Sequence, residues 1–569
     1  MERTKNFIDE LNIDYELARE LVRSTTLFTT HTPVPAGHDV FEEHLLRAYI
    51  PHFCDAFSIS WEEFMSLGRF NQHDNNEKFS MSVLATKLSQ EVNGVSRIHG
   101  RVSREMFAGL YPGYFADEIN IGYVTNGVHY YTWTDKIWQN LHKTYFGEEF
   151  GKNQHIGEYW KKIHSVPDKD IWDIRLKLKA KLIEDLKIKL RNDMTDKAEN
   201  PKHTLSVLSH FNEKALIIGF ARRFATYKRA HLLFTNLERL EKIINNEDRP
   251  VYFFFAGKAH PADKAGQDLI KRIVEISKMP AFVGKIIFID NYDMTLGKLL
   301  TSSVDIWLNT PTRPLEASGT SGEKAVMNGV VNFSVLDGWW AEGYKPGAGW
   351  AVEENRTYEN QGFQDELDAE NIYNTLENEI TDIYYDQDKN DVSERWVAFI
   401  KNNFSKIAPE FTMQRMVNDY YSKFYGRLFK RKDLVYSNDF KIARELVEWK
   451  KTVLNKWSHI KIDSLEVPDV DKGAVEFGTR FYAEIVLDLA GLSKDDIGIE
   501  IVMGNRKNGD LKSILFKQEL ESTYIGEVKA KYVCEFPLRS AGVYDYSFRV
   551  FPKNENLVYR MDFPLLHWI

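Results

Sequence analysis

Short, wholly apolar runs alternate with helical patterns through the middle of the chain. These runs lack the in-and-out alternation of a strand with one exposed face, and helical spacing follows each of them. Strands of this kind belong to parallel sheets that helices cover on both faces. The pattern predicts an α/β domain with a doubly wound parallel sheet, and such sheets bind ligands at the carboxyl ends of their strands. The runs are "KALIIGFA" (214–221), "VYFFFAGK" (251–258), "KIIFIDN" (285–291), "VDIWLNT" (304–310) and "VNFSVLD" (331–337).

Two other patterns flank this middle region. Residues 1 to about 125 are mostly helical in spacing, with loops at "TTHTPVPAGHD" and "GLYPGYF". The helical stretches "TMQRMVNDYYSKFYGRL" and "DFKIARELVEWKKTVLNKW" lead up to Trp457. After Ile460, apolar and polar residues alternate at period two between turn residues, which predicts an antiparallel β-sandwich.

Composition narrows the classes of function. A chain of 569 residues is too long for one hydrophobic core, so several domains are expected. The net charge of −9 argues against binding to nucleic acid or to an anionic membrane. Cys54 and Cys534 form neither a disulfide framework nor a metal pattern, no apolar run approaches a membrane span, and the first residues lack a signal-peptide pattern. We therefore expect a cytoplasmic protein without a metal site.

A basic cluster follows the first of the apolar runs. The segment "GFARRFATYKR" (219–229) is expected to open a helix, with Arg222, Arg223, Lys228 and Arg229 around its N-terminus. A helix N-terminus favours negative charge, and guanidinium groups bind phosphate through paired hydrogen bonds. A basic surface turn is the alternative. Four cations after a buried strand of an acidic protein favour an anion site.

A second segment, "EASGTSGEKAVMNG" (316–329), offers another anion site. Its small residues provide backbone N–H groups and hydroxyls before a helix expected to begin near Glu323. The segment lacks the residue order of a P-loop, and the chain has no GxGxxG, so neither motif supports nucleotide binding. Taken alone, Lys324 fits a phosphate ligand, an anchor for the aldehyde of pyridoxal phosphate, or a surface charge.

Six motifs in order resemble the α-glucan (glycogen, starch, maltodextrin) phosphorylases. "EASGTSGEKAVMNG" with "LDGWWAEGY" is similar to the lysine segment that holds their pyridoxal phosphate, and "RRFATYKR" is similar to their basic anion motif. "DNYDMTLGKLL" resembles the helix start over the cofactor. Further family segments are matched by "TTHTPVPAGHD", "EVNGVSRIHG" and "TNGVHYYTW". The residues of "RPLEASGTSG" and "DGWW" are most similar to those of the shorter bacterial and archaeal branch.

The resemblance implies a GT-B architecture, in which two Rossmann-like domains face each other across a cleft. Because the family has a much longer region ahead of the segment that contains His31, it also implies that most of the N-terminal domain lies outside these residues. The implied parts are the end of the N-terminal GT-B domain (1–130), the C-terminal Rossmann-like catalytic and cofactor domain (131–410), crossover helices (411–460) and the β-sandwich (461–569).

The implied activity is phosphorolysis. Inorganic phosphate would remove the terminal α-1,4-linked glucose of glycogen or maltodextrin as glucose 1-phosphate, with retention, while the cofactor's phosphate exchanges a proton with substrate phosphate. Stacked anions beside an oxocarbenium-like transition state need positioned cations. Two alternatives stay open: a nucleotide-sugar-dependent glucosyltransferase of the glycogen or starch synthase kind, and an inactive glucan-binding fragment. A homodimer and a place in a longer polypeptide also stay open.

The resemblance also implies a role for each matching residue. Lys324 would form the Schiff base with pyridoxal phosphate, and Arg223 and Lys228 would bind substrate phosphate. The remaining cofactor residues would be Arg222, Gly319, Thr320, Tyr292 and Trp133. Those beside the glucose would be Asn126, Glu316, Ser318 and His31. The chain departs from the vertebrate and plant branch at Gly322 and Glu323, where that branch has Asn-Met, and at Asp293, where it has arginine.

Overall fold

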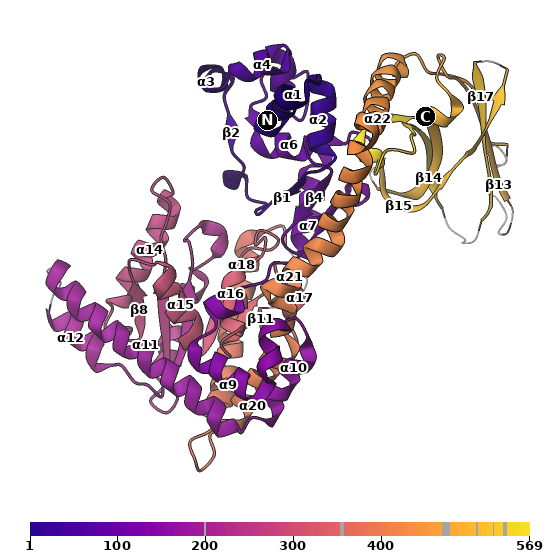
Figure 1. The fold of residues 1–569 in the computed structure, drawn as a ribbon. Helices are drawn as coiled ribbons and strands as arrows, with labels where there is room; N and C mark the ends of the chain where they lie inside the picture. The colour runs from indigo at the N-terminus through magenta and orange to yellow at the C-terminus, as the bar shows by residue number, and fades with distance from the viewer. Residues whose placement is uncertain are drawn as a thin grey trace.

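The structure is a computed structural model that describes residues 1–197, 201–352, 358–468, 478, 480–507, 510–526, 528–538 and 543–569. Figure 1 shows three regions joined by one long helix: an N-terminal helical region, a large α/β region, and a C-terminal region of strands. The expected combination of a parallel-sheet domain with antiparallel sheets is confirmed. No helix among the described residues is long and apolar enough to cross a membrane.

The α/β region contains a six-stranded parallel sheet in the order β11-β10-β9-β6-β7-β8. The chain starts in the middle at β6, adds β7 and β8 on one side, then returns to add β9, β10 and β11 on the other. The sheet is therefore doubly wound, and its order reverses between β6 and β9. The strands are β6 (Leu216–Ala221), β7 (Val251–Ala256), β8 (Ile286–Ile289), β9 (Ile306–Asn309), β10 (Val331–Val335) and β11 (Gly349–Val352).

Two hydrophobic cores, one on each face of this sheet, explain the apolar runs. Ile218 and Phe220 of β6 belong to one core, whereas Ile217 and Ala221 belong to the other. Since successive side chains of a strand point to opposite faces, a sheet covered on both faces needs apolar residues at every position. The predicted strands are confirmed, and β11 is an addition that the sequence reasoning missed. The helices around the sheet include α11 (Asp168–Lys197), α13 (Leu237–Ile244), α14 (Lys264–Ser277), α15 (Met294–Ser303), α16 (Thr320–Val326), α18 (Gln361–Thr375) and α20 (Glu394–Lys406).

The N-terminal region combines helices with a small parallel sheet in the order β1-β4-β5. The helical expectation for this part holds. The sheet matters because its strand ends carry the loops that reach the larger domain. The strands are β1 (Leu27–Thr29), β4 (Glu91–Gly94) and β5 (Ile121–Tyr123), and the helices include α1 (Glu2–Leu11), α2 (Tyr15–Arg23), α6 (Met81–Lys87) and α7 (Arg97–Met106).

A long helical segment connects the three regions. It comprises α21 (Met413–Tyr420), a π-helical turn (Tyr421–Tyr425) and α22 (Gly426–Trp457). In Figure 1 it runs as the orange diagonal from the α/β region to the C-terminal strands. α22 contains a kink, because Ser437, Asn438, Asp439 and Phe440 have non-helical backbone angles. The expected helices before Trp457 are confirmed.

Two four-stranded antiparallel sheets form the C-terminal region, in the orders β12-β13-β17-β16 and β15-β14-β18-β19. Alternate residues of both sheets pack into one core, as the period-two pattern predicted. Arg549 of β18 donates hydrogen bonds to Glu500 within the sheet and to Glu118 of the N-terminal region. The strands are β12 (Lys461–Glu466), β13 (Arg480–Asp488), β14 (Ile497–Lys507), β15 (Asp510–Glu519), β16 (Glu521–Ile525), β17 (Lys529–Pro537), β18 (Asp545–Pro552) and β19 (His567–Trp568).

Candidate functional site

A pocket of about 350 Å³ lies at the carboxyl ends of β6 and β9, where the strand order reverses. Open α/β sheets bind ligands at such a reversal. Loops that follow β6, β8 and β9 line the pocket, together with His31 and Thr32 from the loop after β1. The structure brings together here the predicted residues His31, Arg222, Arg223, Lys228, Tyr292, Glu316, Ser318, Gly319 and Thr320.

Glu316 is the one carboxylate among the cations of this pocket. Its Oε2 accepts hydrogen bonds from Arg222 Nη2 at 2.6 Å and from Lys228 Nζ at 2.5 Å. Burial opposes ionisation of Glu316, but Arg222 and Lys228 outweigh it and hold the pKa of this carboxyl below its usual value. The family resemblance implies a separate ligand for each of these three side chains. In the structure they form a single buried ion cluster.

Lys228 carries a weakened charge in this cluster. Burial and the neighbouring Arg222 lower the pKa of its ammonium to about 8, while Glu316 opposes the shift. Its Nζ also lies 4.5 Å from the centre of the Tyr227 ring, a contact that stabilises the charged form. Lys228 therefore holds its proton less firmly than an exposed lysine does.

Arg222 and Arg223 have N–H groups without a hydrogen-bond partner among the described residues. Arg222 Nε and Nη1 are buried and have no partner among the described residues. The Arg223 side chain is exposed, and within the described ranges it forms neither an ion pair nor a hydrogen bond. Buried donors without a partner are costly, so they indicate a place for a ligand that accepts hydrogen bonds. Beside three cations and one carboxylate, that ligand would be an anion.

The expectation that the basic segment opens a helix is wrong. The chain makes two short 3-10 turns, at Thr226–Lys228 and Leu232–Phe234, and α13 does not begin until Leu237. Arg229 ends this turn with a left-handed φ of 47° and points into the domain. There its guanidinium donates to the backbone oxygens of Thr310 and Pro311 and pairs with Asp365 and Asp368. Arg229 is therefore structural and does not belong to the anion cluster.

The loop that carries Glu316 and Ser318 is fixed by the "DGWW" segment. Asp337 accepts hydrogen bonds from the backbone N–H groups of Glu316 and Gly338, each at 2.8 Å. The backbone N–H of Trp339 donates a hydrogen bond to the backbone oxygen of Ser318 at 2.8 Å. Burial raises the pKa of Asp337 to about 7. The sequence reasoning used this segment only as a family signature and missed its role in holding the loop.

Gly319 is the N-cap residue of α16, which starts at Thr320 and not near Glu323 as expected. Its φ is 91°, a left-handed conformation that favours glycine. A Cβ on Gly319 would lie 3.2 Å from Trp339 Cδ1 and 3.5 Å from Glu316 Cγ. A side chain here would therefore disturb the loop that holds the cluster.

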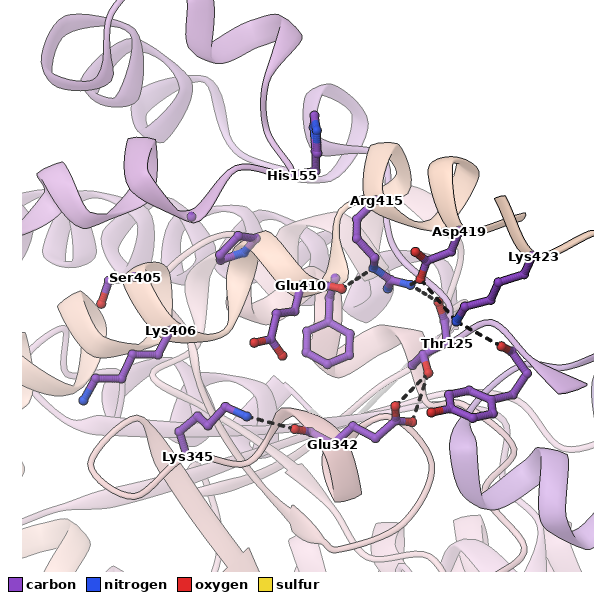
Figure 2. A pocket seen from close by; sticks show the side chains of 14 residues that line it. Thr125, His155, Glu342, Lys345, Ser405, Lys406, Glu410, Arg415, Asp419 and Lys423 are labelled. Atoms are coloured by element: carbon purple, nitrogen blue, oxygen red, sulfur yellow. Dashed lines mark hydrogen bonds and ion pairs between the residues drawn. The ribbon is translucent and has the colours of Figure 1, made fainter. Parts of the chain in front are cut away.

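Asn126 joins this loop to the N-terminal region. Its Nδ2 donates to Ser318 Oγ at 3.0 Å. Arg415 of α21 holds the same strand end, because its guanidinium donates to the backbone oxygens of Thr125 and Asn126. Figure 2 shows Arg415 within a second pocket of about 680 Å³, which Glu342, Lys345 and Glu410 also line. The sequence reasoning predicted Asn126 and missed Arg415.

Lys324 lies in α16, and its Nζ is 3.6 Å from the centre of the Trp133 ring. Burial lowers the pKa of its ammonium, and the neighbouring Glu323 only partly opposes this. No carboxylate pairs with Lys324 among the described residues. A half-buried amine with a lowered pKa is suited to react with an aldehyde. The amine suits an aldehyde and the partnerless N–H groups of Arg222 suit a phosphate, but Lys324 and Trp133 are not among the residues that line the pocket around Arg222.

Glu323, beside Lys324, is a buried acid that the sequence reasoning did not use. Its side chain is inaccessible to solvent, and neither carboxyl oxygen has a hydrogen-bond partner among the described residues. Burial raises the pKa of Glu323 to about 8, although Arg415 and Lys324 draw it down. The group is therefore largely neutral at pH 7.

Across the described ranges, no three His, Cys, Asp or Glu side chains are grouped to hold a metal ion.

Comparisons with known proteins show which family the chain resembles along most of its length. The family model "Carbohydrate phosphorylase" matches residues 1–441, and the model "Glycogen phosphorylase C-terminal domain" matches residues 457–569. The chain is 37% identical to a maltodextrin phosphorylase of Thermococcus litoralis, over all of this chain and 65% of that protein. It is 34% identical to a glycogen phosphorylase of Mycobacterium tuberculosis (strain H37Rv), over 98% of this chain and 64% of that protein. A glycogen phosphorylase of Aquifex aeolicus is 39% identical over 74% of this chain and 59% of its own length.

Proposed function

The chain belongs to the carbohydrate phosphorylase family, and from that premise we propose that it is the catalytic C-terminal part of an α-glucan phosphorylase. The chain spans 65% or less of the three relatives described above, so the activity of the whole protein is part of the proposal. The reaction is the retaining transfer of a terminal α-1,4-linked glucose to inorganic phosphate. The observation that carries the proposal is the cluster of Arg222, Lys228 and Glu316, in the same domain as the reactive amine of Lys324.

Pyridoxal phosphate is the proposed cofactor. Lys324 would hold its aldehyde carbon, and the free N–H groups of Arg222 would hold its phosphate. When bound, the cofactor supplies a phosphate that exchanges a proton with inorganic phosphate. The residues proposed to complete its site are Gly319, Thr320, Tyr292 and Trp133.

Inorganic phosphate would bind between Arg223 and Lys228. The hydrogen bonds that Glu316 Oε2 accepts from Arg222 and Lys228 support the proposal, because a phosphate oxygen could take the same place on these cations. Entry of phosphate would give these cations a stronger acceptor and release Glu316 toward the sugar. A charge-assisted hydrogen bond to a multiply charged phosphate outweighs one to a single carboxylate oxygen. The cluster thus orders phosphate binding before sugar contact.

The glucose would be held by short polar side chains. Asn126 and Ser318, already joined by a hydrogen bond, would exchange that bond for contacts with sugar hydroxyls, and Glu316 would accept from a further hydroxyl. His31, exposed at the pocket, would lie beside the sugar. Polar side chains that are already held in place need little movement when charge develops on the sugar in the transition state.

The proposal extends to the architecture. Two Rossmann-like domains of the GT-B type would face each other across the cleft, with the first represented by its end (1–130) and the second by residues 131–410. Residues 411–460 would be the crossover helices and residues 461–569 a separate sandwich domain. The contact between Asn126 and Ser318 supports a site at the junction of the first two parts.

The test is formation of glucose 1-phosphate from maltodextrin and inorganic phosphate, in protein supplied with pyridoxal phosphate. Arg223→Ala should weaken inorganic phosphate use by about tenfold or more while the cofactor stays bound, because Arg223 is assigned to substrate phosphate alone. Arg272→Ala, which removes an exposed arginine of α14, is the matched control. Transfer of glucose from a nucleotide sugar with no product from phosphate would contradict the proposal and favour the synthase-like alternative.

A further inference from the structure

Residues 125–128 leave the small N-terminal sheet and lie against the start of α21. Val128 forms an isolated parallel bridge with Thr412, the N-cap residue of α21, through backbone hydrogen bonds of 2.9 Å. A Cβ on Gly127 would lie 2.4 Å from the Thr412 oxygen, so this close approach needs a glycine. The backbone around Asn126 is therefore placed by the segment that leads into α21 as well as by its own strand, β5.

Arg415, in the first turn of α21, holds two successive carbonyl groups of this segment. Its Nη1 donates to the Thr125 oxygen at 2.7 Å, and its Nη2 donates to the Asn126 oxygen at 2.8 Å. The guanidinium also donates to the backbone oxygen of Glu410 and to Asp419 Oδ2, so each of its nitrogens is used. A planar guanidinium holds two acceptors in a fixed fork, whereas the ammonium of a lysine offers no such fork.

The fork sets the direction of the Asn126 side chain. The two carbonyl groups belong to the two peptide planes that meet at the Asn126 Cα, so Arg415 fixes the backbone angles of this residue. With these angles fixed the Cβ direction is fixed as well, and Asn126 Nδ2 reaches Ser318 Oγ at 3.0 Å. Arg415 lines the second pocket and is not among the residues that line the pocket with Ser318. It therefore acts on that pocket through Asn126.

Glu342 holds the same segment by another group. Both of its carboxyl oxygens lie 3.0 Å from Thr125 Oγ1, which donates to them, and Oε1 also accepts from the backbone N–H of Arg97 at 2.9 Å. Figure 2 shows Arg415 and Glu342 reaching Thr125 from different sides. Glu342 fixes the Thr125 side chain and leaves the carbonyl groups to Arg415. Loss of Arg415 should therefore free the peptide planes while the segment stays attached.

We propose that Arg415 is a positioning residue for glucose: by fixing the backbone of Asn126, it directs the amide of that residue to a sugar hydroxyl. This role rests on the proposed function, which puts Asn126 at the glucose. Without the fork the amide samples other directions, and the sugar loses a hydrogen bond whose geometry was prepared before binding. The phosphate subsite should not change, because Arg223 and Lys228 belong to the loop after β6.

The test compares a substrate that carries the sugar with one that does not, in protein supplied with pyridoxal phosphate. Arg415→Ala should raise the KM for glucose 1-phosphate in maltodextrin elongation by about tenfold. It should leave the KM for inorganic phosphate in phosphorolysis unchanged. Loss of folded protein lowers the maximal rate and not KM, so this split separates positioning from stability. Arg395→Ala, which removes an exposed arginine paired with Asp386, is the matched control and should leave both KM values unchanged.

Two further variants test how Arg415 acts. Arg415→Lys keeps a positive charge but removes the fork, so its KM for glucose 1-phosphate should stay close to that of Arg415→Ala. Asn126→Ala should raise the same KM, and the double variant with Arg415→Ala should raise it no further, because the two residues act as a unit. The backbone amides of Asn126 and Val128 should exchange hydrogen faster in both Arg415 variants.

Three outcomes in an active protein would overturn the proposal. One is an unchanged KM for glucose 1-phosphate in Arg415→Ala, and another is full restoration by Arg415→Lys, since the charge and not the fork would then matter. The third is a double variant in which the two single effects multiply. If the unaltered protein forms no product, the proposed function fails and hydrogen exchange decides separately: faster exchange at Asn126 and Val128 in Arg415→Ala supports the positioning role, and unchanged exchange overturns it.

Discussion

The carboxylate of Glu316 lies 2.5 Å from the ammonium of Lys228, and the same oxygen accepts a hydrogen bond from Arg222. Arg222 and Lys228 follow β6 in one short segment, whereas Glu316 lies about ninety residues further along the chain. They meet because β6 and β9 are neighbours at the point where the strand order reverses. One carboxylate thus balances part of a buried positive cluster. We propose that phosphate replaces this internal anion when it binds.

Removal of the Glu316 carboxylate should destabilise the protein and make it respond to phosphate. Glu316→Ala leaves Arg222 and Lys228 buried without their anion, and we expect a loss of about 3 kcal/mol in the free energy of unfolding. Inorganic phosphate should restore much of this loss, because it binds the folded cluster and not the unfolded chain. Thermal unfolding with and without phosphate measures both effects.

The control for this prediction is Asp382→Ala, which breaks the exposed ion pair between Arg249 and Asp382. Surface pairs contribute about 1 kcal/mol or less, and this variant should gain no more from phosphate than the unaltered protein does. Equal stabilisation of both variants by phosphate would show that Glu316 does not occupy an anion position.

Glu323 should make stability depend on pH. Burial raises its pKa from 4.5 to about 8 in the folded protein, so the folded state holds a proton that the unfolded state releases. The contribution of this proton to the free energy of unfolding is complete below pH 4.5 and is lost as the pH rises through 8. Glu323→Gln stays neutral throughout, so its stability relative to the unaltered protein should rise between pH 5 and 8, by an amount on the order of a few kcal/mol.

Urea unfolding of both proteins at several pH values measures this difference, and the comparison cancels the other titrating groups. A difference that stays constant from pH 5 to 8 would show that Glu323 is ionised in the folded protein.

Gly319 should be intolerant of a side chain for two separable reasons. Gly319→Ala places an alanine at a φ of 91° and puts its Cβ 3.2 Å from Trp339 Cδ1. Gly147 has nearly the same φ, 92°, but its ψ is 167° against 40° at Gly319, and a Cβ added there would have no neighbouring atom within 4 Å. Gly319→Ala should lose about 1–2 kcal/mol to left-handed backbone strain, and Gly147→Ala should lose at least as much, because its backbone conformation is almost confined to glycine. Gly319→Ala alone should also bind phosphate more weakly, because Glu316 and Trp339 must move.

Chemical denaturation and phosphate titration of the two variants make the comparison. If Gly147→Ala weakens phosphate binding as much as Gly319→Ala does, the effect is a general loss of stability and not a local disturbance of the loop.

The sequence predicted those features that depend on local pattern. Strands such as β6 and β7 were visible because burial on two faces requires an uninterrupted apolar run, and Lys324 and Arg222 stood in motifs next to such strands. The family resemblance stated from these motifs is confirmed by the family models and the relatives. The roles of the individual residues remain predictions.

Features that depend on tertiary packing could not be predicted from the sequence. The pairing of Glu316 with Lys228 requires the strand order of the sheet, which no local pattern specifies. Arg229 resembles its basic neighbours in the sequence, but a left-handed turn directs it to Asp365 and Asp368. The burial of Glu323 depends on the segments that pack against α16, so the sequence around it does not reveal it.

The most direct test of the central claim is to locate a bound pyridoxal group. The protein is incubated with pyridoxal phosphate, reduced with borohydride and mapped by mass spectrometry of its peptides. A pyridoxyl group is expected on Lys324. Lys324→Arg should abolish it, and Lys406→Arg, a change outside the site, should leave it unaltered. Absence of the group from Lys324, or its attachment mainly to another lysine, would show that Lys324 does not hold the cofactor.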